Sequence, residues 1–496
     1  MKRLGLILLL LLCSRTLQAA EPFVFNAELV KAYYHIMALR LDQGLTILES
    51  EKKKNPDSPA LAFISDYHFF LRSFINEDVK EYDEEIAAFH ERLNLIKKGD
   101  KQSPYYNYCQ AELLIHQAAM RFKFGDYIRG AQNVRESYLL LKENIAKYPD
   151  FKPNYKSIGA LEVLIGTVPP KFSWVTNLLG MQGNIPEGMK KIESYRNAAY
   201  TNPETEMFKE EALFLYAFLQ LHIVKEKDEA WKDIDLATRD YRSNLLHCYA
   251  RAAVAQHCKK TDEMILTLSN RPKGKEYAKF YFLEYMLGTA YLHKLDTNAQ
   301  IHLKTFVSLF KGKNYIKDAY RKLAWSYLCA GDMERFKIYM GMVIRFGNDQ
   351  VDEDKQALRE AEHGEIPHTE ILKSRMLFDG GYYEKALAFL TPLSTVVWKN
   401  EREKIEYPYR LARVYDEMGN DPKAIVFYLK TIDLGGKSPW YFAANSSLHL
   451  GYLYERKGNY ALAKLYFDKA MSFPNDEYKL SISQKAKAGL ERIKHK

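Results

Sequence analysis

Two segments near the end of the chain carry the same residue pattern, 39 positions apart. Each has a small residue after a leucine, an aromatic three positions later, a turn glycine, and then an alanine and a second aromatic. The pattern positions are Leu411, Ala412, Tyr415, Gly419, Ala424 and Tyr428 in the first copy and Leu450, Gly451, Tyr454, Gly458, Ala463 and Phe467 in the second. Self-similarity at a fixed spacing indicates stacked copies of one supersecondary unit, which cannot bury its apolar face alone.

This pattern resembles the tetratricopeptide repeat, a hairpin of two antiparallel helices. The resemblance implies an all-α fold, a right-handed α-α superhelix built from stacked hairpins. In such a hairpin the small residues let the two helices approach, and the aromatic residues fill the wedge between one hairpin and the next. The first helix of each hairpin would line a concave groove.

Matching segments can be followed backward from this pair. They centre on Ala386, Leu323 and Leu287, which gives five hairpins from about residue 275 onward. A last helix, roughly Ser481 to Lys494, is expected to cap the array with a polar face. The sequence therefore predicts a repeat array over 271–496.

Residues 21–270 are also expected to be helical, because their apolar residues recur at spacings of three and four and alternating strand patterns are scarce. Ala27 to Lys54 reads as a helical pair with a turn near Asp42-Gln43. Gln110 to Lys147 reads as a second pair with a turn at Gly125-Asp126. This half is less regular than the array.

A break at 166–188 interrupts this half, because Pro169 and Pro170 stop a helix. Phe172 and Trp174 lie within it and are candidate binding residues, either as a plug for the solenoid or as a lip over a ligand. The segment resembles the core of the inclusion-body clearance family of tetratricopeptide proteins, which implies shared helical-repeat ancestry alone. That resemblance rests on Gly159, Ala160, Leu161, Leu164, Ile165, Pro169, Leu179, Gly180, Gly183 and Gly188.

The first twenty residues read as a bacterial secretory signal peptide. Lys2 and Arg3 precede an apolar run, and a small-residue exit ends near Ala20. The prediction is an exported, periplasmic protein that touches a membrane only peripherally, if at all. An outer-membrane lipoprotein would need Cys13 to be lipidated, but Leu12 stands where a small residue is usual.

The charge of the chain and its cysteine and histidine residues argue against several classes of function. The net charge of +9 falls to +6 without the signal peptide, and no basic stripe concentrates it, so no nucleic-acid partner is expected. The four remaining cysteines, at positions 109, 248, 258 and 329, are expected to be buried free thiols. The pairs His247-Cys248 and His257-Cys258 sit nearly three helical turns apart and cannot share a metal. No catalytic set, metal site or cofactor is predicted, and the chain is not expected to be an enzyme.

These observations predict a non-catalytic scaffold that holds a partner protein or peptide on the concave face of the array. Arg410, Arg413, Asn445 and His449 fall on the first helices of the best repeats and are the candidate contacts. The alternative is an outer-membrane-associated protein that binds a glycan or small ligand, with tyrosines stacking on sugar rings. An enzyme on a helical frame is a third reading, for which no residues can be named. The sequence leaves the partner and the oligomeric state open.

Overall fold

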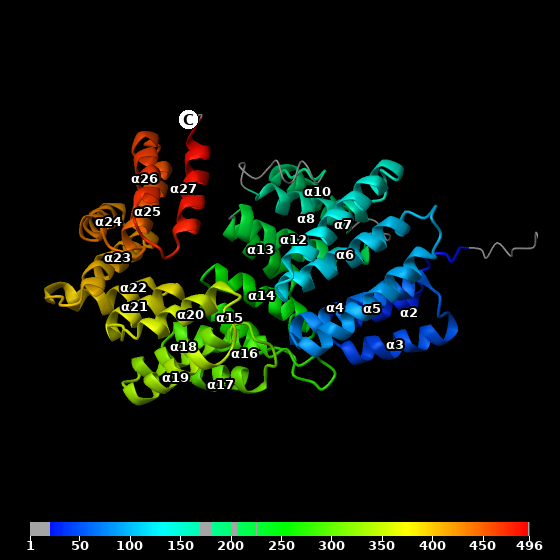
Figure 1. Cartoon of the computed structure of the whole chain (residues 1–496), viewed down its shortest axis with the longest axis horizontal. Coiled ribbons are helices and arrows are strands. Elements are labelled where there is room, and N and C mark those ends of the chain that lie inside the picture. Colours follow the sequence, from blue (N-terminus) through cyan, green and yellow to red (C-terminus); the bar gives the residue numbers. More distant parts are fainter. Residues whose placement is uncertain (1–19, 169–179, 200–205, 225, 495) are drawn as a thin grey trace, which may run out of the picture. The chain divides into compact units, whose positions relative to one another are not determined.

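The computed structural model describes residues 20–168, 180–199, 206–224, 226–494 and 496. Within these ranges all regular elements are helices, with one isolated bridge between Glu21 and Gly99. The fold is all-α and consists of tetratricopeptide-like helical hairpins in tandem (Figure 1). The predicted signal peptide, Cys13, Phe172 and Trp174 lie outside the described residues. No described helix has the length and apolar character needed to cross a bilayer.

The chain forms two compact units. Of the described residues, unit 1 comprises those within 20–258, 267–280 and 310–312, and unit 2 comprises those within 259–266, 281–309 and 313–496. Helix α15 (Thr261–Ser269) spans the change from one unit to the other.

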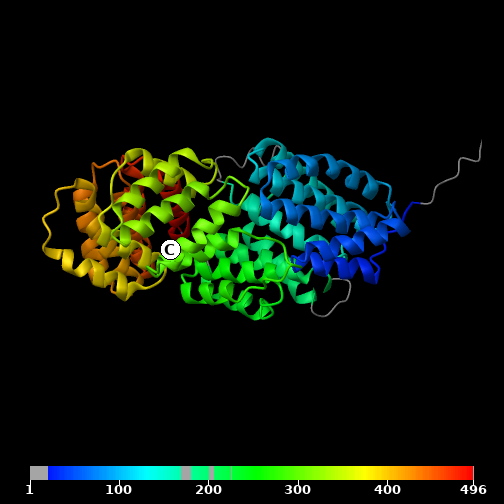
Figure 2. The ribbon, with the colours of Figure 1, turned by 90° about the horizontal axis from the view of Figure 1, so that it is seen from below.

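Unit 1 is built from successive helical pairs, and its first helices, coloured blue and cyan, run side by side in Figure 2. The described helices are α2 (Ala27–Met37), α3 (Leu41–Lys54), α4 (Pro59–Asn76), α5 (Val79–Lys97), α6 (Tyr105–Lys123), α7 (Tyr127–Lys147), α8 (Pro153–Gly166), α10 (Ile185–Ala199), α12 (Lys209–Leu219), the π-helical turn η2 (Gln220–Val224), α13 (Lys227–Ala237) and α14 (Leu245–His257). The turn at Gly125-Asp126 is confirmed, and Gly125 adopts a φ of +84° there.

The predicted helical pair over Ala27 to Lys54 is confirmed, but its turn does not lie near Asp42-Gln43. The chain turns earlier, where Leu39 has a φ of +57°, and α3 already begins at Leu41. Asp42 lies in the first turn of α3, where its negative charge interacts favourably with the positive end of the helix dipole and stabilises the helix. An acidic residue that starts a helix was thus mistaken for a turn residue.

Glycines bring α8 and α10 into close contact. A Cβ on Gly159 would lie 2.7 Å from the carbonyl oxygen of Gly188, and a Cβ on Gly188 would lie 2.6 Å from that of Gly159. Neither position has room for a side chain, because backbone faces backbone at the crossing. Gly188 lies inside α10, so it serves this helix contact and not the turn that its place near the Pro/Gly break indicates.

Unit 2 contains the five predicted hairpins and the predicted final helix. The hairpins are α16 (Phe282–His293) with α17 (Asn298–Leu309), α18 (Ile316–Cys329) with α19 (Met333–Arg345), α21 (Thr369–Asp379) with α22 (Tyr383–Leu390), α23 (Glu401–Glu417) with α24 (Asp421–Gly435), and α25 (Phe442–Arg456) with α26 (Tyr460–Ser472); the last helix is α27 (Lys479–Ile493). The 3₁₀ turn η3 (Thr391–Thr395) follows α22 and contributes to the long repeat period.

One further helix, α20 (Asp352–His363), stands between the second and third hairpins of unit 2. His363 ends α20, Gly364 caps it with a φ of +66°, and His368 is the residue before α21. Three acidic residues in the first turn of α20 favour helix formation there.

The repeat positions occupy the packed centre of this unit. Ala412, Ala424 and Ala463 are fully buried. A Cβ on Gly451 would lie 2.5 Å from the ring of Phe467, so this position must stay small for the two helices of its hairpin to meet. Tyr415 stacks on Phe427 with 5.8 Å between ring centroids, and Tyr454 stacks on Tyr466 at 5.6 Å. Gly419 and Gly458 both turn the chain with a φ of +71°.

Candidate functional site

The first helices of successive hairpins in unit 2 form one row. Helices α16, α18, α21, α23, α25 and α27 each pack against the next member of the row. We call the surface of this row the inner face. Between its last four helices lies a cavity of about 240 Å³, the inner cavity. Its lining residues are Arg375, Phe378, Asp379, Tyr409, Arg410, Arg413, Tyr441, Asn445, Tyr478, Ser481, Ile482 and Lys485.

Helical periodicity brings these side chains together. Residues three and four apart lie on one face of a helix. Helix α21 supplies residues 375, 378 and 379, α23 supplies 409, 410 and 413, and the start of α27 supplies 478, 481, 482 and 485. Each helix therefore presents one short row of side chains to the cavity. The three- and four-residue spacing along each helix decides which residues line it.

The inner cavity is basic. Four of its lining residues are Arg or Lys, whereas Asp379 is the single acidic one. Arg410 pairs with Glu406 at 2.6 Å, but the Arg375–Asp379 contact is 3.9 Å long. Lys485 forms no ion pair with any residue that the structure describes. Positive charge is therefore available to a ligand inside the cavity.

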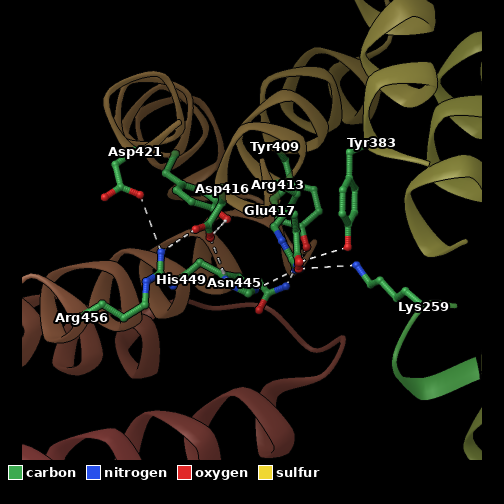
Figure 3. Close-up of polar contacts among 11 residues, drawn as sticks. Lys259, Tyr383, Tyr409, Arg413, Asp416, Glu417, Asp421, Asn445, His449 and Arg456 are labelled. Atoms are coloured by element: carbon green, nitrogen blue, oxygen red, sulfur yellow. Dashed lines mark hydrogen bonds and ion pairs between the residues drawn. The ribbon is translucent and has the colours of Figure 1, made fainter. Parts of the chain in front are cut away.

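Arg413 is held in place by its neighbours, as Figure 3 shows. It donates to Nε2 of His449 at 2.8 Å and to Glu417 at 3.3 Å. Its buried Nε has no hydrogen-bond partner among the described residues. Asn445 donates to the hydroxyl of Tyr409 at 2.7 Å. The site is preorganised, because side chains fixed in this way lose little freedom when a ligand binds.

Carboxylates behind the site complete this network. Asp416 accepts from Arg456 and from Tyr428, each at 2.8 Å, and Glu417 lies 3.5 Å from Lys259 (Figure 3). Burial, together with the positive charge of Arg413, lowers the pKa of His449 well below its usual value. A neutral His449 can therefore accept the hydrogen bond from Arg413.

Lys485 differs from the arginines. Partial burial and the charge of Arg413 lower its pKa. A bound anion would relieve this repulsion, because an opposite charge stabilises the ammonium form.

The predicted contact residues fall into three groups. Arg410, Arg413 and Asn445 line the inner cavity, although Arg410 is 8% exposed and its charge faces Glu406. His449 does not line the cavity and instead supports Arg413. Phe172 and Trp174 lie outside the described residues.

Sequence reasoning missed several lining residues. Arg375 stands 38 positions before Arg413, the spacing that also separates Ala386 from Ala424, so the repeat register could have identified it. Lys485 could not be found in this way, because α27 has no second helix and follows no repeat pattern.

The histidine and cysteine pairs do not form a second site. His247 lies in α14, where it contacts Glu210 at 3.3 Å and Asp240, and these carboxylates raise its pKa to about 9 against the effect of burial. None of the four cysteines forms a disulfide within the described residues; Cys109 and Cys248 are buried as expected, whereas Cys258 and Cys329 are only half-buried. Within the described part of the chain, no group of three or more His, Cys, Asp or Glu side chains could hold a metal ion.

No protein-family model matches this sequence, and no curated relative matches it. Among solved structures, the human IFIT1 dimer with PPP-AAAA aligns over 96% of this chain and 96% of its own, with 11% identity and a TM-score of 0.30. The structure of Naa15/Naa10 bound to HypK-THB aligns over 94% of this chain and 72% of its own, with 13% identity and a TM-score of 0.19. TM-scores this low carry no argument about function, so the site is interpreted from its own residues.

Proposed function

We propose that this protein is an exported, non-catalytic scaffold that holds an acidic segment of a partner protein in the inner cavity of unit 2. The observation that carries the proposal is the excess of Arg and Lys over acid in a preorganised cavity of about 240 Å³. The repeat resemblance favours a peptide as the ligand. The basic lining of the cavity indicates that this peptide is negatively charged.

The contacts would be charge-assisted hydrogen bonds. Arg413 has an unused Nε, Arg375 has only a long contact to Asp379, and Lys485 has no ionic partner in the described residues. Such donors bind carboxylates more strongly than neutral donors do. Asn445 and Tyr478 would add polar and aromatic contacts to the peptide backbone and side chains.

Two fluorescent peptides of equal length test this function. One alternates glutamate with apolar residues, and the other carries glutamine at each glutamate position. Full-length mature protein should bind the glutamate peptide about tenfold more tightly than the glutamine peptide, and added salt should reduce the difference.

Lys485→Gln should lose most of this preference, whereas Lys479→Gln, on the same helix outside the cavity lining, should keep it. Equal affinity for the two peptides, or equal behaviour of the two variants, would show that the inner cavity does not select acidic segments. A single-stranded RNA of matched charge, titrated in parallel, tests the prediction that nucleic acid is not the partner.

Export is tested separately, by fractionating cells that produce the full chain. We expect the protein in the periplasmic fraction and a mature N-terminus near residue 20. Recovery of the full-length chain in the cytoplasm would contradict this part of the proposal.

A glycan is the second candidate ligand, and Tyr478 is the observation that favours it. Its ring lines the inner cavity, it is 38% exposed, and the backbone holds it at a φ of +55°. An exposed aromatic face can stack on a sugar ring. A glycan array decides between a peptide and a glycan ligand. If a sugar binds tightly and Tyr478→Ala abolishes this binding, the ligand is a glycan and not a peptide.

A further inference from the structure

A second, smaller pocket of about 60 Å³ opens on the same inner face and is lined by five arginines. We call it the arginine pocket. Its arginines come from four helices: Arg321 from α18, Arg359 from α20, Arg375 from α21, and Arg402 and Arg410 from α23. Arg321 and Arg410 are paired with Asp318 and Glu406. The other three arginines have only long ion pairs or none with described residues, so their like charges repel one another and an anion would offset the repulsion.

Most of these guanidinium groups have unused donors. Arg359 forms neither an ion pair nor a hydrogen bond with a described residue, and the nearest acid to Arg402 is Glu365 at 3.6 Å. Arg321 pairs with Asp318 and with Glu360, but its side chain is only 6% exposed and its buried Nε has no partner in the part of the chain that is described. A buried donor without a partner costs free energy unless a ligand or water satisfies it.

The acidic residues of the pocket satisfy few of these donors. Glu360 is occupied by the indole of Trp325 at 2.6 Å and by Arg321 at 3.5 Å. The other lining acid is Glu477, whose buried Oε2 accepts no hydrogen bond from a described residue. The pocket therefore combines an excess of donors with one unused carboxylate oxygen.

We propose that the arginine pocket binds a phosphoryl group, either as inorganic phosphate or as a phosphorylated side chain of the segment in the inner cavity. Planar guanidinium groups match the oxygens of a phosphate, with two parallel hydrogen bonds for each well-placed arginine. Inorganic phosphate as HPO₄²⁻, or a phosphorylated side chain below its second pKa of about 6, also carries an O–H that can donate to Oε2 of Glu477. Sulfate has no such proton at neutral pH and would leave that oxygen repelled.

The second source rests on the proposed function, because the arginine pocket adjoins the inner cavity. The two share Arg375, Arg410, Tyr441 and Tyr478 as lining residues. A peptide in the inner cavity could thus place a phosphorylated residue in the arginine pocket.

Calorimetric titration of the full-length mature protein with inorganic phosphate at constant ionic strength is the first test. We expect saturable binding that Arg359→Gln weakens about tenfold, because this exposed arginine has no structural partner to lose. Arg345→Gln, an exposed arginine on α19 outside the pocket, is the matched control and should bind like wild type. Absence of binding, or equal loss in both variants, would overturn the proposal.

Sulfate, titrated in the same way, tests the role of Glu477. Wild type should prefer phosphate to sulfate by about tenfold, and Glu477→Gln should reduce that preference, since an amide can donate to sulfate. Equal binding of both ions by wild type would overturn the assignment to a phosphoryl group.

The glutamate peptide with one phosphoserine separates the two sources and the two proposals. If the phosphopeptide binds more tightly than the unmodified peptide and Arg359→Gln abolishes this gain, the ligand of the pocket is a phosphorylated side chain. If the phosphopeptide shows no gain but inorganic phosphate still binds through Arg359, the ligand is the free ion. If neither phosphate nor the phosphopeptide binds at this pocket while the glutamate peptide still depends on Lys485, only this inference fails. If phosphate binds through Arg359 and no peptide binds, the proposed function fails alone.

Discussion

A buried charged cluster of unit 1 is fully paired, whereas the arginines that line the inner face of unit 2 are only partly paired. In unit 1 the ammonium of Lys156, 1% exposed, lies 2.7 Å from both Glu112 and Glu211. Tyr33 donates to Glu211 and Ser157 donates to Glu112, so each carboxylate has two partners. In unit 2, arginines of the inner face line cavities and keep donors free.

The difference shows which charged clusters are structural and which can bind. In the network of Lys156 every carboxylate faces a cation and a hydroxyl, which is the arrangement of a structural cluster. Arg321 is only partly satisfied, because Asp318 and Glu360 take its terminal NH groups and its Nε has no partner in the described residues; Arg359 forms no ion pair with a described residue. Burial alone does not distinguish the two cases, because Arg321 is nearly as buried as Lys156.

Lys156→Met should have the largest effect on stability. It would leave Glu112 and Glu211 buried without their cation, at a cost of about 3–5 kcal/mol in the free energy of unfolding. Thermal unfolding followed by circular dichroism measures it, and an unchanged first transition would show that the network is not closed as described.

Ala463→Leu tests the packing of the unit 2 hairpins. Ala463 is fully buried, and a larger side chain should overpack its hairpin and cost about 1–3 kcal/mol. Leu465→Ala, on the same helix but 55% exposed, should change the free energy of unfolding by less than about 0.5 kcal/mol. Similar melting curves for the two variants would contradict the repeat register.

The acid sensitivity of unit 2 should depend on His449. Its pKa is lowered in the folded state, so the unfolded chain binds the proton more readily. The stability that neutral His449 contributes is therefore present above pH 6.5, its usual value, and is lost as the pH falls below it. The loss can reach about 1.4 kcal/mol for each pH unit.

His449→Gln keeps an acceptor for Arg413 but cannot titrate in this range. Chemical denaturation between pH 7.5 and 5.5 should show a smaller loss of stability in the variant than in wild type. If the stability of both proteins fell equally with pH, His449 would not be the group that titrates. That result would contradict a neutral His449 that accepts the hydrogen bond from Arg413.

The smallest expected effect on stability is that of Arg359→Gln. Because Arg359 is exposed and has no ionic partner in the described residues, the free energy of unfolding of the variant without ligand should match that of wild type within about 0.5 kcal/mol. A marked destabilisation would show that Arg359 has a structural role, as the Lys156 cluster has in unit 1, and would contradict its role in binding.

Much of the fold could be predicted from the sequence where the repeat register holds. Ala412, Gly451 and Ala463 identified the hairpins, because close helix contact requires small residues at fixed positions. Helix α20 was missed because it has no partner in the repeat pattern. The turn after α2 was misplaced because Leu39, an ordinary apolar residue, adopts a positive φ that no propensity indicates.

The candidate site was only partly predictable for the same reason. Arg410, Arg413 and Asn445 follow the register of the first helices, and the structure places all three in the lining of one cavity. The arginine pocket draws on Arg321 and Arg359, which belong to helices far from the clearest repeats. No sequence pattern relates α18, α20 and α23, so only the folded chain brings their arginines together.

Charge reversal at Lys485 tests the central claim most directly. The affinities of wild type and Lys485→Glu are measured for the glutamate peptide and for a peptide with lysine at the same positions. Binding in the inner cavity predicts that Lys485→Glu weakens the glutamate peptide about tenfold and strengthens the lysine peptide. Unchanged affinity for both peptides would contradict an acid-binding cavity in unit 2.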